Sequence, residues 1–152
     1  YGNYVKKDNS ISQDFKKVNE LIEKMDLGNI AGKPFGYLSD GEKQISLIGR
    51  AIINNPKVLI LDEPSVNIDL KSKIFLTKKI DNLSKLGISI LCITHDVSLI
   101  TKDYNRIILL KNGTIYKEGN TNQLMNTKNI NKLFDIKVKV VENNNSWDII
   151  RN

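Results

Sequence analysis

The sequence is poor in cysteine and in long apolar runs. Its 152 residues include a single cysteine, Cys92, so no disulfide can form within the chain, which fits a reducing compartment. No apolar run approaches the roughly 18 residues that a membrane-spanning helix needs. The polar start YGNYVKKDNS lacks the apolar core of a signal peptide. We therefore expect a chain that is itself soluble and cytoplasmic, with a length that suits one ordinary domain.

The charges are not gathered by sign. There are 23 basic and 17 acidic residues, a formal net charge of +6, and acids separate the lysine pairs such as Lys6-Lys7 and Lys78-Lys79. Aromatic residues make up 7% of the chain, so side chains for stacking on bases are few as well. A nucleic-acid surface needs clustered lysine and arginine. We interpret the basic residues as solvated surface and expect no nucleic-acid partner.

A Walker A phosphate loop is also missing. The stretch GYLSDGEKQ, Gly36 to Gln44, holds two glycines five apart and then a lysine. A Walker A loop needs lysine and Ser/Thr directly after its second glycine, because these side chains must reach the phosphates and the magnesium. Here Glu42 intervenes before Lys43, and no other stretch fits the pattern.

Hydrophobic periodicity predicts four helices. Apolar residues recur at three and four positions over 11–25, 41–54, 70–86 and 121–134. Ser10 or Ser12 is the expected cap of the first helix, and Ser39 or Asp40 that of the second. Gly87 is placed to end the third. The first ten residues, which are polar, are expected to form a loop or a frayed end.

Short continuous apolar runs predict strands between these helices. KVLILDEP and ISILCITHD have the pattern of strands that a parallel sheet buries on both faces. Asn112-Gly113 predicts a hairpin within RIILLKNGTIYKEG, and IKVKVVE with SWDII can close a small second one. Strand, helix, strand, helix in the middle of the chain indicates right-handed parallel crossovers. The predicted fold class is therefore α/β.

Both predicted parallel strands end in residues that can act on a nucleotide. Asp62 and Glu63 end the first, and His95 and Asp96 end the second. Four apolar residues followed by Asp is the Walker B pattern, in which the carboxylate meets magnesium, and an adjacent Glu can orient or deprotonate water. Each piece alone has a plainer reading, as a turn cap or as a structural histidine. Their joint occurrence on successive strands favours nucleotide chemistry.

From about Ser12 to Phe134 the chain resembles the second half of an ATP-binding cassette (ABC) ATPase. Leu38 to Glu42 is similar to the Leu-Ser-Gly-Gly-Gln signature motif, and Arg50-Ala51 to a pair in the following helix. Val58 to Asp62 resembles Walker B, and Ser65 to Asp69 the D-loop. The resemblance makes Glu63 the catalytic glutamate and His95 the switch histidine.

The resemblance also implies ligands and partners. ATP and Mg²⁺ would be the cofactors, with Asp62 as the magnesium ligand. Ser39, Asp40, Gly41, Glu42 and Asp69 would face the nucleotide of a second nucleotide-binding subunit in a head-to-tail dimer. The signature would act as a helix N-terminus that offers unsatisfied N–H groups to phosphate. Asp40 stands where the family has glycine, so its carboxylate is expected to weaken this site unless it caps the helix or points away.

We expect a single partial ABC ATPase domain over 1–152, the carboxyl-terminal part of a P-loop NTPase fold with a parallel sheet core. Its parts would be a helical subdomain with the signature helix (1–55), a Walker B, D-loop and H-loop core (56–119), and a carboxyl-terminal helix and tail (120–152). Without Walker A, the chain alone is expected to bind ATP poorly and to hydrolyse it negligibly.

Three kinds of function compete: a transporter ATPase, a non-transport ABC ATPase and a non-catalytic binding module. The compact spacing and the tail LFDIKVKVVENNNS resemble the ATP-hydrolysing subunit of a transporter, most of all importers of iron-chelate or cobalamin type, bound through permease subunits to the inner face of the membrane. A chromosome or repair ATPase would show sustained heptads, and none is visible; a translation-type ATPase and a non-catalytic binding module are further alternatives. We favour the transporter, with an iron chelate or a related metal or cofactor as substrate.

Overall fold

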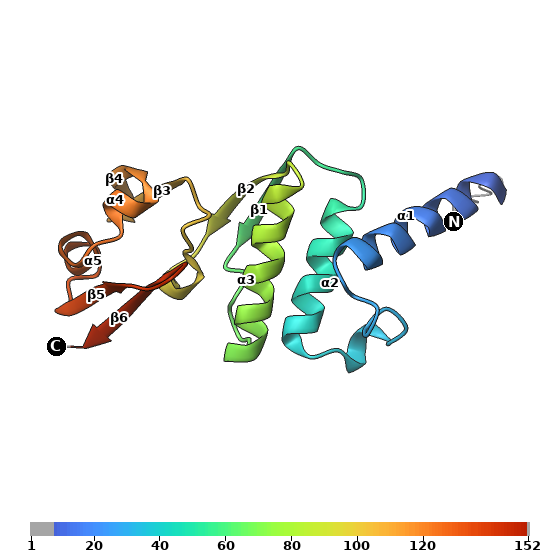
Figure 1. The fold of residues 1–152 in the computed structure, drawn as a ribbon, viewed down its shortest axis with the longest axis horizontal. Helices are drawn as coiled ribbons and strands as arrows, with labels where there is room; N and C mark the ends of the chain where they lie inside the picture. The colour runs from blue at the N-terminus through green and yellow to red at the C-terminus, as the bar shows by residue number, and fades with distance from the viewer. Residues whose placement is uncertain (1–7, 152) are drawn as a thin grey trace. The chain divides into compact units, whose positions relative to one another are not determined.

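The computed structural model describes residues 8–151, which divide into two compact units (Figure 1). The first unit ends at Ile93 and the second begins at Thr94. Helices and strands alternate along the chain, which confirms the predicted α/β class. The prediction of a loop or frayed end lies outside the described residues up to position 7, whereas residues 8–10 are already helical.

The first unit contains three helices of the predicted set. Its elements are α1 (Asp8–Lys24), η1 (Phe35–Tyr37), α2 (Asp40–Ile52), β1 (Val58–Asp62), α3 (Leu70–Lys85) and β2 (Ser89–Ile93). Because α1 begins before Ser10, neither Ser10 nor Ser12 is its cap, and this prediction is wrong. Gly87 has a φ of 86° and its N–H donates to the Ser84 carbonyl at 3.1 Å, so it ends α3 as predicted.

The core of the first unit lies between α2, α3 and one face of the β1–β2 pair. In Figure 1, α2 and α3 run side by side. Gly49 of α2 packs beside the residue that follows α1, because a Cβ at this position would be in ordinary contact with the Met25 sulfur at 3.6 Å. The sequence places Ile45, Leu47, Ile48, Ala51 and Ile52 on one apolar stripe of α2. That stripe is partly wrong, because Leu47 is 46% exposed and the buried residues Gly41 and Gly49 take part in the inner face of the helix. The buried apolar residues are Met25, Leu27, Ile30, Leu38, Ile45, Ile48, Ile52, Leu59, Leu61, Leu76, Ile80 and Leu83.

Strands β1 and β2 pair in parallel, as predicted, but they are covered on one face only. Val58, Ile60 and Asp62 pair with Ser89, Leu91 and Ile93, so these six side chains share a face. Exposure on this open face reaches 63% at Ile60 and 50% at Leu91, whereas Leu59 on the other face is 5% exposed. The expectation of strands buried on both faces is therefore wrong for this chain. The sheet has two strands and no layer of the described residues covers this face.

The second unit consists of two hairpins and short helices. Its elements are η2 (Val97–Leu99), β3 (Arg106–Lys111), β4 (Thr114–Asn120), α4 (Thr121–Leu124), α5 (Thr127–Phe134), β5 (Val138–Glu142) and β6 (Trp147–Arg151). Both predicted hairpins are confirmed, and Asn112 and Gly113 have φ values of 52° and 73° at the first turn. The single helix predicted over 121–134 is wrong. Asn126 interrupts it because its side chain caps α5, accepting from the Asn129 N–H at 3.0 Å.

A small core holds the second unit together. Met125, Ile130, Val138 and Trp147 form it.

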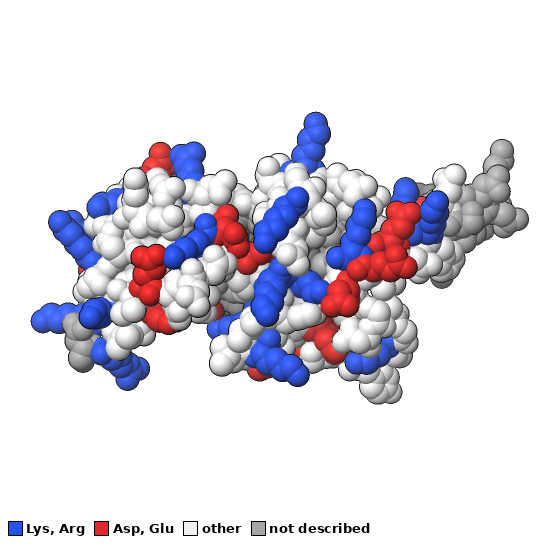
Figure 2. Space-filling view, in the orientation of Figure 1, with Lys and Arg blue, Asp and Glu red and all other residues white. Residues whose placement is uncertain are grey.

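Across the described part of the chain, no helix has the length and apolar character needed to cross a membrane. On the face drawn in Figure 2, acidic side chains lie among the more numerous lysine and arginine side chains, in keeping with a solvated surface.

Candidate functional site

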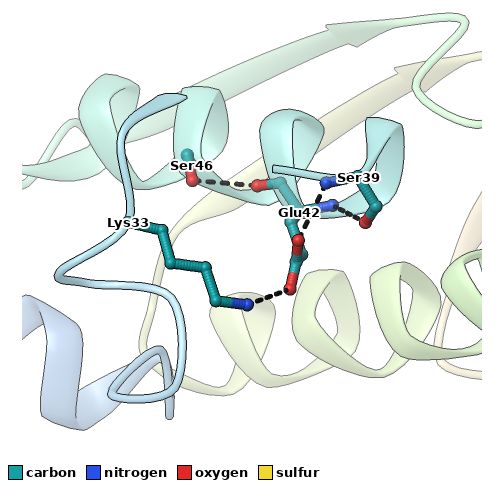
Figure 3. A network of polar contacts seen from close by, with 4 residues as sticks. All are labelled: Lys33, Ser39, Glu42 and Ser46. Carbon is teal, nitrogen blue, oxygen red and sulfur yellow. Dashed lines mark hydrogen bonds and ion pairs between the residues drawn. The ribbon is translucent and has the colours of Figure 1, made fainter. Parts of the chain in front are cut away.

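The predicted signature motif forms a reciprocally capped helix start. Leu38 is buried and anchors the turn before α2, and Ser39 is the N-cap in an extended conformation. The Ser39 hydroxyl accepts from the Glu42 N–H at 3.3 Å, and a Glu42 carboxylate oxygen accepts from the Ser39 N–H at 2.8 Å (Figure 3). This capping box satisfies donors that the helix start would otherwise leave open. Of the two predicted caps, Ser39 is the one used.

Glu42 links this helix start to the preceding connection. Its second carboxylate oxygen lies 3.3 Å from the ammonium of Lys33, as Figure 3 shows. The hydrogen bond from the Ser39 backbone N–H, followed by the bond and charge of Lys33, holds the pKa of Glu42 below its ordinary value. Glu42 is therefore an ionised structural group that fixes the turn, and its carboxylate oxygens are occupied by donors from this chain.

Asp40 is the first residue of α2, and its side chain lies on the outer surface. The carboxylate accepts from the Lys43 ammonium at 3.0 Å, one turn along the helix, and it is 66% exposed. An acidic residue in the first turn stabilises a helix through its dipole. Asp40 thus occupies neither the cap nor the interior, and Lys43 partly neutralises it.

Gly41 is the point at which α2 meets α3. A Cβ placed on this buried glycine would lie 2.5 Å from Oγ of Ser72 and closer still to the Ser72 Cβ. Ser72 in turn holds the last residue of the predicted D-loop: its N–H donates to Asp69 Oδ1 at 3.0 Å and its hydroxyl donates to Oδ2 at 2.7 Å. These bonds, from the hydroxyl first, lower the pKa of Asp69. The structure therefore brings the predicted signature and the predicted D-loop together through Ser72, a residue that belongs to neither motif.

The predicted Walker B pair lies where β1 ends. Asp62 is the last residue of the strand, exposed on the open face of the sheet. Glu63 follows with a φ of 47°, and its N–H donates to the Ile93 carbonyl at 2.9 Å. Left-handed backbone at a non-glycine residue is uncommon and concentrates at functional sites. Asp62 supplies one exposed carboxylate. Proteins commonly bind Mg²⁺ through one or two carboxylates, while phosphates and water provide the other ligands.

The remaining predicted residue, His95, belongs to the second unit. It is exposed and follows Ile93 by two positions in the sequence. The next residue, Asp96, caps η2 through the N–H of Ser98 at 3.1 Å. The described residues contain no group of three or more His, Cys, Asp or Glu side chains arranged to hold a metal ion.

Sequence reasoning missed Ser72 and Lys33. Asp69-x-x-Ser72 has the spacing at which an N-cap carboxylate meets the third residue of a helix, so this bond was open to prediction. The contact of Ser72 with Gly41 joins segments far apart in the sequence and left no local signal. The same holds for Lys33, whose partner Glu42 lies across a connection without regular period.

Comparison with known proteins assigns this arrangement to a family. A model of the ABC transporter family matches residues 3–66. An uncharacterized ABC transporter ATP-binding protein of Methanocaldococcus jannaschii is 32% identical over 125 residues, which cover 82% of this chain and 49% of that protein. The hemin import ATP-binding protein HmuV of Hahella chejuensis is 30% identical over 134 residues, covering 84% of this chain and 52% of that protein. The chain spans about half the length of the curated relatives it matches.

Solved structures agree with this match. One described as a putative metal-chelate type ABC transporter in an inward-facing conformation has a TM-score of 0.80 at 22% identity, over 98% of this chain and 61% of that one, and shows the fold. A dimeric ATP-binding cassette bound to ADP and Pi has a TM-score of 0.56 at 28% identity, over 69% of this chain and 46% of that one. The fold is that of part of an ABC cassette. Residues 3–66 thus match the ABC transporter family, and the chain is similar to about half of ABC transporter ATP-binding proteins.

Proposed function

We propose that this chain is the carboxyl-terminal part of the ATP-hydrolysing subunit of an ABC transporter. The observation that supports it best is the end of β1, where Asp62 is exposed and Glu63 is held in left-handed backbone by the neighbouring parallel strand. In open parallel sheets, ligands bind outside the carboxyl ends of the strands. A carboxylate for metal and a second for water at this position suit phosphoryl transfer.

In the proposed reaction the residues of this chain have separate tasks. Asp62 would hold Mg²⁺, which would supply positive charge to neutralise the phosphates. Glu63 would accept a proton from the attacking water or orient it towards the γ-phosphate. His95 would take the role of the family's switch histidine and donate a hydrogen bond to the phosphate. The phosphate loop itself must come from a segment with a Walker A sequence, which these residues do not contain.

The signature segment would act on a second subunit. The solved cassette that resembles this chain is dimeric with ADP and Pi bound, which supports a dimer here. The capping box uses the N–H groups of Ser39 and Glu42, and those of Asp40 and Gly41 in the first turn would remain for a phosphate. Ser39 and Gly41 would thus contact the partner's nucleotide, and Asp69 would lie at the dimer interface. Because the Glu42 oxygens are bound to Ser39 and Lys33, Glu42 would support this contact from behind.

A cavity in the first unit is suited to a membrane partner. It has a volume of about 330 Å³ and lies between α1, the following connection and α2, with Val18, Leu21, Ile22, Phe35 and Ile53 among its apolar lining. Lys33 and Arg50 also line it. A partner helix could place an apolar side chain in this cavity and an adjacent carboxylate beside the two cations. We assign this cavity to a permease subunit, which would place the protein on the inner face of the membrane.

An iron chelate or a related metal or cofactor is the substrate we propose. One relative is a hemin import protein, and the solved structure with a TM-score of 0.80 is described as of metal-chelate type. The transported molecule would touch the permease and not this chain, so the proposal rests on these relatives alone.

Phosphate release tests the proposal. The chain alone should release phosphate from ATP no faster than buffer. A cassette in which the chain is joined to a Walker A half, from its own gene or from the hemin import relative, should turn over. Glu63→Gln in that cassette should abolish turnover and keep ATP binding. Glu118→Gln, a change at an exposed acid paired with Arg106, should leave both ATP binding and turnover unchanged. Turnover that survives Glu63→Gln would remove this residue from catalysis.

A further inference from the structure

The starts of α2 and α3 approach each other more closely than any residue with a side chain at position 41 allows. A Cβ on Gly41 would lie 2.5 Å from Oγ of Ser72 and 3.5 Å from its Cα. Real Cβ atoms essentially never come within 3.0 Å of another heavy atom. Gly41 is therefore needed for the packing of two helices, independently of any contact with phosphate. Its φ lies in the ordinary helical range, so backbone freedom does not explain it.

The side chain that Gly41 accommodates is itself fixed on the other side. Ser72 donates its hydroxyl to Asp69 Oδ2 at 2.7 Å and its N–H to Oδ1 at 3.0 Å. Both oxygens of the Asp69 carboxylate are therefore occupied by one residue of the first turn of α3. A rotation of the Ser72 side chain would break the hydroxyl bond, and a movement of α3 towards α2 would press Oγ into the Gly41 backbone. Close-packed contacts of this kind transmit displacement and do not absorb it.

We propose that Ser72 is a positioning residue that locks the signature-helix start to the loop ending at Asp69. The inference rests on the proposed function, because both segments face a partner subunit only if the chain forms the proposed dimer. Within that dimer, the two segments move as one body, and the phosphate contact of α2 is set by the position of Asp69. Ser72 lies outside the motifs that carry the family resemblance, so neither motif predicts this role.

The contact is tested first in the 152-residue chain, by hydrogen exchange of the segments 38–48 and 66–76. Gly41→Ala should accelerate exchange in both segments by about tenfold, although only one of them is changed, because overpacking forces the helix starts apart. Combining it with Ser72→Gly, which removes the opposing side chain, should cancel most of that acceleration relative to Ser72→Gly alone. Acceleration confined to 38–48, or unchanged in the double variant, would overturn the proposed lock.

The role in the dimer is tested in the cassette completed with a Walker A half. Ser72→Ala should weaken ATP-driven dimerisation by about fivefold or more and leave the ATP affinity of the monomer unchanged, because the nucleotide of each monomer is held by its own phosphate loop. Ser84→Ala is the matched control, since this serine of α3 donates to the Asp81 carbonyl at 2.7 Å at the far end of the helix. Equal dimerisation of the Ser72→Ala and Ser84→Ala cassettes would overturn the positioning role. A wild-type cassette that binds ATP and stays monomeric would instead count against the proposed function, and the exchange experiment would still decide the contact.

Discussion

The N–H of Glu63 donates to the carbonyl of Ile93 at 2.9 Å, which extends the pairing of β1 and β2 by one bond beyond the strand. This bond holds Glu63 at a φ of 47°. Left-handed backbone costs a non-glycine L-residue about 1–2 kcal/mol. The proposed catalytic glutamate thus sits in a conformation that the sheet imposes on it, and the strain fixes the direction in which its side chain leaves the strand end.

Replacing Glu63 with glycine should therefore separate stability from activity. Glu63→Gly is expected to raise the free energy of unfolding of the 152-residue chain by up to about 1 kcal/mol, since glycine adopts this φ without strain. In the completed cassette the same change should abolish ATP turnover. Asn67→Gly is the control: Asn67 has a φ of 62°, and asparagine tolerates this region, so the gain should be smaller. Urea unfolding measures both, and a loss of stability in Glu63→Gly would show that the side chain holds the turn.

The capping box predicts different effects for Ser39, which caps α2, and Ser46, which lies inside it. Ser39→Ala should lower the free energy of unfolding by about 1 kcal/mol, because the Glu42 N–H loses its acceptor. Ser46 lies inside the helix and donates its hydroxyl to the Glu42 carbonyl at 2.8 Å. Ser46→Ala should be neutral or slightly stabilising, because such bonds to the preceding turn compete with the helix. Thermal and urea unfolding of the two variants compare them directly, and equal losses would contradict the box.

Asp69 predicts a pH dependence of known sign. The hydroxyl and N–H of Ser72 lower the pKa of Asp69 in the folded chain. The stabilisation that this carboxylate contributes is therefore fully present above its ordinary pKa and is lost as the pH falls through the lowered folded value. Asp69→Asn should accordingly be less stable than the wild type at neutral pH. Urea unfolding over a pH series should show the two proteins converging once the pH lies below the lowered pKa of the folded chain.

A titration of the Asp69 carboxyl carbon by NMR checks the cause. In Ser72→Ala the hydroxyl donor is gone and the backbone donor remains, so the pKa of Asp69 should rise towards its ordinary value without reaching it. An unchanged titration would mean that other groups set this pKa.

Local patterns predicted most elements of this chain and the cap of α2, whereas the predicted caps of α1 and the single helix over 121–134 were wrong. Asn112-Gly113 gave the first hairpin because both residues accept positive φ, and Ser39 with Glu42 three residues later has the spacing of a capping box. The helix break at Asn126 also has a local cause, since the Asn126 side chain caps α5. The apolar periodicity continues across Asn126, so the pattern predicted one helix and not two. The order of Asp62, Glu63 and Asp69 along the chain was likewise enough to predict which elements carry them.

Non-local features were beyond such patterns. An apolar strand has the same sequence whether one of its faces or both are covered. Ile60 and Leu91 are exposed because no layer of the described residues covers their face of the sheet, and the strand sequence does not reveal this. The contact of Gly41 with Ser72 and the ion pair of Lys33 with Glu42 depend on how connections return to a helix start. No period or propensity encodes these distances. Sequence patterns thus identify candidate site residues, but they do not identify the contacts that position them.

Removing the Asp40 carboxylate should strengthen the ATP-driven dimerisation of the completed cassette. Its carboxylate lies in the first turn of α2 and is balanced by Lys43 at 3.0 Å. Near a partner's phosphate the negative charge should repel, so Asp40→Gly in the completed cassette should strengthen ATP-driven dimerisation by about threefold to tenfold. Lys43→Gln leaves Asp40 without its cation and should weaken dimerisation. Sedimentation with and without ATP measures both, and no change in either would show that Asp40 faces solvent in the dimer.

The open face of β1–β2 predicts a difference between the chain and a complete cassette. Ile60 is 63% exposed here, and Leu91 beside it is 50% exposed. We expect the half of the relatives that this chain does not span to cover such a face. Ile60→Thr should reduce self-association and apolar-dye binding of the 152-residue chain at little cost in stability. In the completed cassette the same change should cost about 1–3 kcal/mol, because burial there includes the lost apolar contact and an added hydroxyl.

Leu59→Thr provides the matched comparison, because Leu59 lies on the covered face of the same strand at 5% exposure. It should destabilise the chain and the cassette alike. Unfolding of both variants in both contexts separates the faces. If Ile60→Thr cost as little in the cassette as in the chain, the open face would remain solvent-exposed, and the complementary half would have to pack along the strand edges instead.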